Sequence, residues 1–316
     1  MSARLPLALG ALLVGALLAP SARADSPFEV AVTFDDLPAG GGRVELSELQ
    51  DLTADLLASI AEHGVPAVGF VNEAKLYEMG EVDARIAVLE GWLAAGLELG
   101  NHTFSHPSLH DTPLEAFKED VVRGETVTRR LLHGHQDASL RYFRHPYLRT
   151  GRDLATKLAF ESFLAARGYT VAPVTLENHD YIFAALYRRA LGEGDLEGAA
   201  KVGDAYVAFT FELVAFHERA ARTVFGRPIR HVLLLHANRL NADRFGELAQ
   251  GFKTRGYAFV TLERALEDPA YGTQDTYTGP AGVNWLFRWA QRLGVAVDWR
   301  SEPDVPAWVR EDFAGR

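Results

Sequence analysis

The stretch VTFDDLP, residues 32–38, sets two adjacent carboxylates directly after an apolar run. The run is rich in β-branched and aromatic residues, so it predicts a buried strand at about residues 28–34. Asp35 and Asp36 repel each other and resist desolvation at the end of such a strand. Nearby groups must therefore compensate both charges, and the candidates are a metal ion and an arginine.

Apolar runs of this kind alternate with longer amphipathic segments along the chain, which predicts a parallel sheet covered by helices. We expect strands at about residues 28–34, 66–71, 97–100, 141–144, 169–175, 231–236 and 257–260. These runs correspond to about seven βα units. In an α/β barrel the C-terminal ends of the strands converge on one face, and active sites lie there.

Residues 1–24 have the features of a secretory signal peptide. Arg4 is followed by an apolar run over residues 5–19, and small residues stand at Ala22 and Ala24. We predict cleavage after Ala24 and export to the periplasm or the medium. A membrane anchor is the alternative, but the apolar run is short for a span. We expect no stable membrane anchor after cleavage.

The composition is that of a folded globular protein, with 48% hydrophobic and 23% charged residues. A formal net charge of -10 argues against binding to nucleic acid or to an anionic membrane surface. The chain contains no cysteine, which excludes a disulfide framework and a thiolate as nucleophile or metal ligand. Any metal must therefore be held by His, Asp or Glu.

We interpret residues 25–316 as a single barrel domain, because most connections between the expected elements are short. Two segments depart from the regular alternation. A helical insertion at about residues 181–230 has two helical patterns instead of one, and an aromatic-rich extension at about residues 267–316 has one further helix at about 283–293. Both segments either add packing around the barrel or line a sugar-binding cleft with their aromatic residues. The sequence leaves both interpretations open.

Ionisable residues stand at the C-terminal ends of the expected strands. They are Asp35 and Asp36 after the first, His102 and His106 after the third, Arg144 after the fourth, Asp180 after the fifth and His236 at the end of the sixth. Convergence of these ends on one face would bring all of them to one place.

The two histidines in GNHTFSHPSL, residues 100–109, are four positions apart. One helical turn would put both imidazoles on the same side. With a carboxylate from the earlier Asp-Asp turn they make a two-His, one-carboxylate site that keeps positions open for water and substrate. We predict that Asp36, His102 and His106 hold a divalent metal.

The remaining ionisable residues suit a hydrolase. Asp35, beside the ligand but free of the metal, can take the proton of an activated water, and Arg144 can keep this base ionised. His236 closes the apolar run HVLLLH and can protonate a leaving group if a carboxylate favours its imidazolium form. Asp180, in ENHDYIF, is a candidate for that carboxylate. The alternatives are an exposed Arg144, a buried core histidine at His236 and a structural role for Asp180.

The blocks TFDD, NHTFSH, FRHPY, NHD and LLLH resemble, in the same order, the motifs of the polysaccharide deacetylase family. This family comprises metal-dependent carbohydrate esterases and amidases built on the NodB-homology domain, as in carbohydrate esterase family 4. The resemblance covers about residues 28–260 and implies a distorted (β/α) barrel with seven or eight strands.

Carried over residue by residue, the resemblance implies Asp35 as the base and His236 as the acid. It implies a divalent metal at the three expected ligands, usually zinc, with cobalt, nickel and manganese as alternatives. It places Arg144 against the base and Asp180 against the acid. It also offers the backbone N–H of Tyr147 for stabilising the oxyanion.

Two positions depart from the family's pattern. Leu148 stands where the third motif commonly has glycine, and Tyr181 follows Asp180 where the fourth motif normally has a tryptophan nearby. These departures concern the identity of the substrate more than the chemistry.

We therefore expect an exported metal-dependent hydrolase that removes N- or O-linked acetyl groups from a saccharide or polysaccharide. Three alternatives remain. A hydrolase of non-peptide C–N bonds in small amides would use the same barrel and metal, and a non-haem iron oxygenase also uses two His and one carboxylate. A non-catalytic glycan-binding protein would have lost the base or the acid. The sequence identifies neither the acetylated substrate nor the oligomeric state.

Overall fold

The computed structural model describes residues 28–135 and 139–315, so the expected leader at residues 1–24 lies outside the described residues. The strands are β1 (Phe28–Leu37), β2 (Ala67–Val71), β3 (Glu98–Asn101), β4 (Tyr142–Phe143), β5 (Thr170–Val171), β6 (Leu176–Glu177), β7 (His231–His236) and β8 (Tyr257–Phe259).

The α-helices are α1 (Leu46–His63), α2 (Val82–Ala94), α3 (Leu114–Arg123), α4 (Thr126–His133), α5 (Leu154–Ala166), α6 (Asp180–Gly192), α7 (Leu196–Phe225), α8 (Arg239–Thr254), α9 (Leu262–Leu266), α10 (Trp285–Leu293) and α11 (Ala307–Ala314). Short 3-10 helices are η1 (Glu73–Leu76), η2 (Pro146–Leu148), η3 (Pro269–Gly272) and η4 (Trp299–Ser301). Within the described ranges, no helix is both long enough and apolar enough to cross a membrane.

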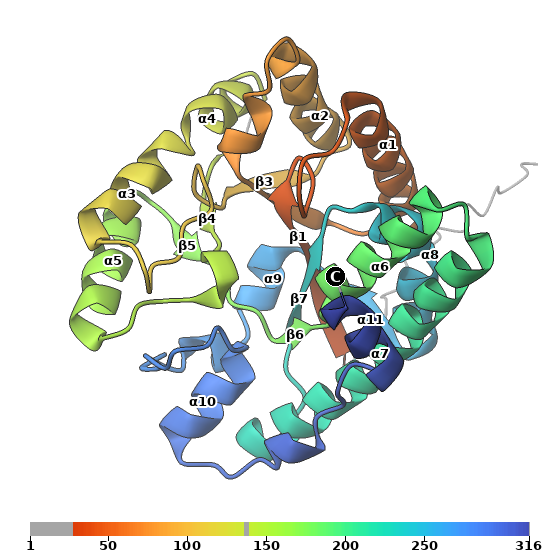
Figure 1. Ribbon diagram of the computed structural model, residues 1–316. Coiled ribbons are helices and arrows are strands. Elements are labelled where there is room, and N and C mark those ends of the chain that lie inside the picture. Colours follow the sequence, from red (N-terminus) through yellow and green to blue (C-terminus); the bar gives the residue numbers. More distant parts are fainter. Residues whose placement is uncertain (1–27, 136–138, 316) are drawn as a thin grey trace, which may run out of the picture.

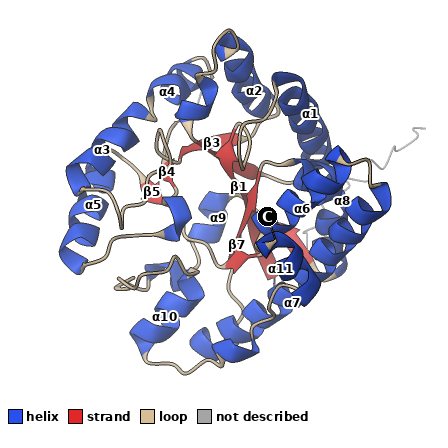
Figure 2. Ribbon diagram, in the orientation of Figure 1, coloured by secondary structure: helices blue, strands red, loops and turns tan. Residues whose placement is uncertain are grey.

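The strands form one parallel sheet that curls into an open barrel. Its hydrogen-bonded order is β5-β4-β3-β2-β1-β7-β6, and β8 pairs with the start of β1. Among the described residues no ladder joins β5 to β6, so the barrel stays open between these two strands. Helices surround the sheet (Figures 1 and 2). The expected distorted α/β barrel is confirmed.

The fifth expected strand, residues 169–175, is wrong in its extent. Its beginning forms β5 at one edge of the sheet, whereas β6 at the other edge follows after residue 175. Pro173 stands between the two strands, and proline has no N–H to donate to a sheet ladder. The chain therefore crosses from one edge of the open barrel to the other within a few residues.

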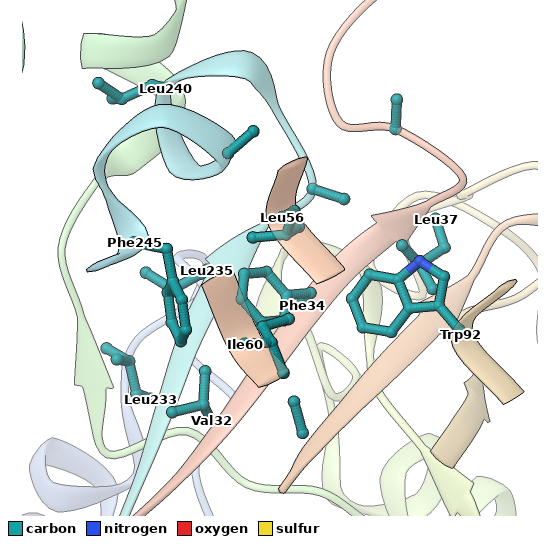
Figure 3. Packing of buried hydrophobic residues seen from close by; sticks show 14 of the residues in the cluster. Val32, Phe34, Leu37, Leu56, Ile60, Trp92, Leu233, Leu235, Leu240 and Phe245 are labelled. Carbon is teal, nitrogen blue, oxygen red and sulfur yellow. The ribbon is translucent and has the colours of Figure 1, made fainter. Parts of the chain in front are cut away.

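The central strand β1 is buried on both faces. On one face Phe34 packs edge-on against Trp92 of α2 and Phe245 of α8, with ring centroids 5.6 and 5.5 Å apart (Figure 3). On the other face Ala31 lies in a smaller buried cluster that includes Leu262 of α9. Burial of both faces is typical of parallel strands and explains the uninterrupted apolar run. Asp35 and Asp36, which follow this apolar run, are thereby held at the end of a buried strand.

The helical insertion and the C-terminal extension contain different helices from those of the regular βα units. The insertion consists of α6 and the long helix α7, as the doubled helical pattern predicts. The C-terminal extension contains α10 and also α11, which the sequence did not predict. Trp285 and Trp289 of α10 pack in a buried cluster with Leu148 and Leu234. For these aromatic residues the packing interpretation holds.

Candidate active site

The C-terminal ends of the central strands and the loops after them form the candidate active site. In the described part of the chain, six non-glycine residues have a left-handed backbone, and all six lie at this end of the sheet. They are Asp36, Thr103, His106, Tyr147, Leu148 and His179. This conformation is costly for residues with a Cβ atom and is typical of functional sites. The folded protein therefore holds these segments in shapes that their local sequence disfavours.

Asp36, His102 and His106 meet at one point of this site. One candidate ligand atom from each lies within 4.8 Å of the other two. Oδ1 of Asp36 is 3.5 Å from Nε2 of His102 and 3.4 Å from Nε2 of His106. This Oδ1 is buried and has no hydrogen-bond partner among the described residues. The fold thus brings together the three residues that the sequence predicts as metal ligands.

His102 presents the lone pair that a metal needs, and both histidines are neutral. Nδ1 of His102 lies 2.8 Å from the carbonyl oxygen of Arg144, so its N–H donates there and Nε2 keeps a free lone pair. Burial lowers the pKa of His102 well below its ordinary value and also lowers the pKa of His106, which keeps both imidazoles neutral. Two neutral imidazoles and an unpaired carboxylate oxygen fit a divalent metal.

Lys75, in η1, is a site residue that sequence reasoning missed. Its Nζ is 3.2 Å from Oδ2 of Asp36 and donates to the carbonyl oxygen of Ala39 at 2.9 Å. Burial raises the pKa of Asp36, but Lys75 and the nearby histidines outweigh this effect and hold the pKa well below its ordinary value. Asp36 is therefore ionised. No sequence signal could have found Lys75, because only the fold brings η1 beside the end of β1.

Asp35 is buried and pairs with Arg144. Nη1 of Arg144 lies 3.3 Å from both carboxylate oxygens, and Nη2 donates to Oγ1 of Thr33 at 3.0 Å. The arginine is fully buried, so the alternative of an exposed Arg144 is wrong. Burial raises the pKa of Asp35 to about 6, against the opposing effect of Arg144. A carboxyl group with a pKa this close to neutrality is suited to accept a proton.

His236, at the end of β7, is held by Asp180, the first residue of α6. Nδ1 of His236 lies 2.6 Å from Oδ1 of Asp180, and its backbone N–H donates to Oδ2 at 2.7 Å. The side-chain amides of Asn238 and Asn241 also donate to Oδ2, at 3.2 and 2.6 Å. Burial lowers the pKa of His236, but Asp180 outweighs it, so the pKa is raised to about 10. The imidazole is therefore protonated at neutral pH.

The register of the sheet makes Asp35 and His236 neighbours. β1 and β7 are parallel, and their register pairs the Cα atoms of these two residues. Paired residues of parallel strands point to the same face of a sheet. Both side chains accordingly line the same cavity. Asn238 and Asn241 follow directly in LLLHANRLN, and their place after a strand end was the signal that could have found them.

Tyr147 lies in η2, in the loop after β4. Its side chain is exposed, and its ring lies edge-on to the ring of His106, with centroids 4.4 Å apart. Tyr147 and Leu148 both line the cavity. The fold thus places the residue that the resemblance implies as oxyanion donor beside the cluster of metal-ligand candidates.

A cavity of about 510 Å³ lies between these groups and α6. Tyr181, Ala184, Ala185 and Arg188 of α6 line one side of it. The insertion therefore contributes to the cleft, and Tyr181 supplies the aromatic ring that follows Asp180 in the sequence. From the described part of the C-terminal extension, only Gly282 reaches the cavity.

Comparison with known proteins gives matches to deacetylases. The family profile described as Polysaccharide deacetylase matches residues 22–162. The peptidoglycan-N-acetylglucosamine deacetylase of Bacillus cereus is 28% identical over 103 residues, which are 33% of this chain and 32% of that protein. The chitooligosaccharide deacetylase of Sinorhizobium fredii is 30% identical over 144 residues, which are 46% of this chain and 58% of that protein. The matches therefore span less than two thirds of either relative.

The fold extends the similarity beyond the matched segment. The structure of the chitin deacetylase from the fungus Colletotrichum lindemuthianum has a TM-score of 0.52 and 21% identity, and it covers 77% of this chain and 88% of its own. At this identity the likeness shows the fold alone. The residues that the profile matches include the site positions Asp35, Asp36, His102, His106 and Arg144. In sequence and in fold, the chain therefore resembles the polysaccharide deacetylase family, as the five sequence blocks predict.

Proposed function

We propose that this protein is an exported metal-dependent hydrolase that removes N- or O-linked acetyl groups from a saccharide. One observation carries the proposal: three candidate metal ligands line one cavity together with Asp35, which pairs with Arg144, and His236, which pairs with Asp180. The similarity to deacetylases supports the substrate class. Export is inferred from the leader-like residues 1–24.

Asp36, His102 and His106 would hold the metal, and zinc suits their nitrogen and oxygen atoms, as do cobalt, nickel and manganese. When bound, a divalent metal supplies Lewis acidity, which polarises the acetyl carbonyl and lowers the pKa of a coordinated water. Lys75 holds the second oxygen of Asp36, so that the other oxygen faces the histidines.

Asp35 would take one proton from the attacking water. Arg144 fixes the carboxylate and keeps it available in the buried site. His236 would give its proton to the departing nitrogen or oxygen as the bond to the acetyl group breaks, which yields acetate and the free amine or alcohol. Asp180 holds the imidazole through Nδ1, so Nε2 is the donor that remains. The N–H of Tyr147 would stabilise the developing negative charge.

The non-catalytic alternative predicts a missing base or acid. Here Asp35 and His236 are both present, and each has a buried charged partner. A hydrolase of small amides is distinguished only by its substrates, so a panel of acetylated glycans and small amides separates it from the proposed deacetylase. Dependence on oxygen would identify the iron oxygenase.

The direct test compares the wild-type protein with Asp35→Asn. Purified wild-type protein should contain about one divalent metal, release acetate from acetylated glycans and begin at Asp25. Asp35→Asn should keep the metal and lose on the order of a hundredfold or more of the activity, because a positioned base contributes at least that much. Asp51→Asn, at an exposed position of α1, is the matched control and should stay active. Full activity of Asp35→Asn would overturn the mechanism.

A further inference from the structure

The loop that carries Tyr147 needs support from outside its own sequence. Tyr147 and Leu148 have φ angles of 55° and 52°, so two consecutive residues with side chains adopt a left-handed backbone. Residues with a Cβ atom disfavour this conformation, and a structure keeps it only where surrounding contacts impose it. Leu148 stands where glycine would relieve the strain. The contacts that hold the loop come from the C-terminal extension.

A buried ion cluster joins the extension to this loop. We call its four residues, Thr150, Lys157, Asp275 and Arg288, the tail clamp. Oδ2 of Asp275 accepts from Nη1 of Arg288 at 2.9 Å and from Nζ of Lys157 at 2.5 Å. Both cations also donate to Oγ1 of Thr150, at 3.0 Å each. The side chains of Lys157 and Arg288 are 1% and 0% exposed, so the cluster is shielded from water.

Arg288 connects the tail clamp to the loop by direct hydrogen bonds. Its Nη2 donates to the carbonyl oxygen of Leu148 at 2.5 Å, and its Nε donates to the carbonyl oxygen of Val283 at 2.9 Å. One guanidinium therefore binds the loop and the extension at once. Such a rigid, fully charged fork fixes several acceptors in one geometry.

Gly282 makes an independent contact with the same loop. A Cβ atom at this position would lie 1.7 Å from the carbonyl oxygen of Tyr147, which is far too close for any side chain. The backbone of the extension therefore lies directly against the peptide that follows Tyr147. The side chain of Leu148 adds a third contact, because it packs in the buried cluster with Trp285 and Trp289.

We propose that the C-terminal extension positions the Tyr147 backbone for catalysis, with Gly282 and Arg288 as positioning residues. The inference rests on the proposed function, in which the N–H of Tyr147 stabilises the oxyanion. The extension lies outside the segment that matches the family profile, residues 22–162. A glycine at position 148 would adopt the left-handed backbone without such support. With leucine there, the C-terminal extension supplies the contacts that hold the loop.

The test compares Gly282→Ala with Gly272→Ala in the full mature chain. Gly272 lies in the same extension, and a Cβ atom there meets nothing within 4 Å. The added Cβ atom must displace the Tyr147 peptide, which lowers the thermal midpoint as well. A displaced catalytic group costs on the order of a hundredfold, so Gly282→Ala should lose about that factor in kcat for acetate release, with KM near wild type. Hydrogen exchange at the amides of Leu148 and Arg149 should become faster. Gly272→Ala should match the wild type in every measurement.

The two readouts separate this inference from the proposed function. If the wild type releases no acetate, the proposed function fails, and hydrogen exchange in Gly282→Ala still decides whether the extension positions the loop. Wild-type kcat together with unchanged exchange in Gly282→Ala overturns the inference. If that variant does not fold, Arg288→Lys serves instead, because lysine keeps the charge beside Asp275 but has no second nitrogen for Leu148. Wild-type kcat in Arg288→Lys would likewise overturn it.

Discussion

At the scale of single residues, two adjacent aspartates have different partners. Asp35 pairs with the buried Arg144, whereas Asp36 pairs with Lys75 on one oxygen and faces two histidine nitrogens with the other. The left-handed backbone of Asp36 lets consecutive side chains point to different partners. The repulsion expected between these charges is thus compensated at two separate places. Because the two carboxylates have separate partners, a substitution of one leaves the contacts of the other in place.

The Asp180–His236 pair predicts how activity depends on pH. Asp180 raises the pKa of His236 to about 10 despite burial, so this proposed proton donor loses its proton only as the pH rises through about 10. In Asp180→Asn the carboxylate is gone and burial lowers the pKa, so the alkaline limb of the kcat profile should move to lower pH, toward or below 6.5. The profile should be measured with Asp51→Asn as control. An unmoved alkaline limb would show that His236 is not the acid.

At the scale of elements, α6 supplies both a partner of His236 and part of the cavity wall. Its first residue, Asp180, orients His236, and Ala184 and Arg188 one and two turns later line the cavity. Helix α7 supports the same network, because the hydroxyl of Tyr206 donates to Oδ1 of Asn241 at 2.6 Å. The insertion therefore contributes residues to the candidate active site.

A larger side chain on the α6 wall of the cavity should impair binding of large substrates more than binding of small ones. Ala184→Phe adds an aromatic ring to the cavity wall. KM for an acetylated oligosaccharide should rise by about tenfold or more, because a steric misfit of a few carbon atoms in a pocket weakens binding by that factor. A small acetyl ester should be hydrolysed nearly as before. Ala200→Phe, at an exposed position of α7, is the control. Equal effects on both substrates would mean that oligosaccharides do not lie along α6.

At the scale of the whole molecule, the candidate metal ligands join two separate parts of the sheet. Asp36 lies near the end of β1, and His102 and His106 lie in the loop after β3. An ion bound between them ties these parts together and stabilises only the folded state.

Zinc should therefore raise the thermal stability of the wild-type protein. A free concentration of about one hundred times Kd stabilises by about 2.7 kcal/mol, which corresponds to a rise of several degrees in Tm. His106→Gln should abolish this rise, and the exposed His133→Gln should retain it. Calorimetry with and without zinc measures both. The same rise in His106→Gln would place the ion elsewhere.

Much of the fold and of the site follows from local patterns in the sequence. Apolar runs set the strands because burial on both faces demands them, and the ionisable residues after the runs of β1, β3, β4 and β7 mark the carboxyl edge of the sheet. The fifth strand was misjudged because Pro173 divides a run whose apolar character continues. Lys75 could not be found, since nothing in its neighbourhood indicates that it will face Asp36.

The sequence by itself determined which residue types stand at the strand ends and in what order. Only the tertiary structure decided that Asp35 and His236 are side by side, that Lys75 meets Asp36 and that Arg288 holds Leu148. Register and long-range hydrogen bonds depend on how the whole sheet and its helices pack, and partners 109 or 140 residues apart leave no local trace. The left-handed backbone of Tyr147 and Leu148 has the same cause, because contacts from the C-terminal extension hold it against local preference.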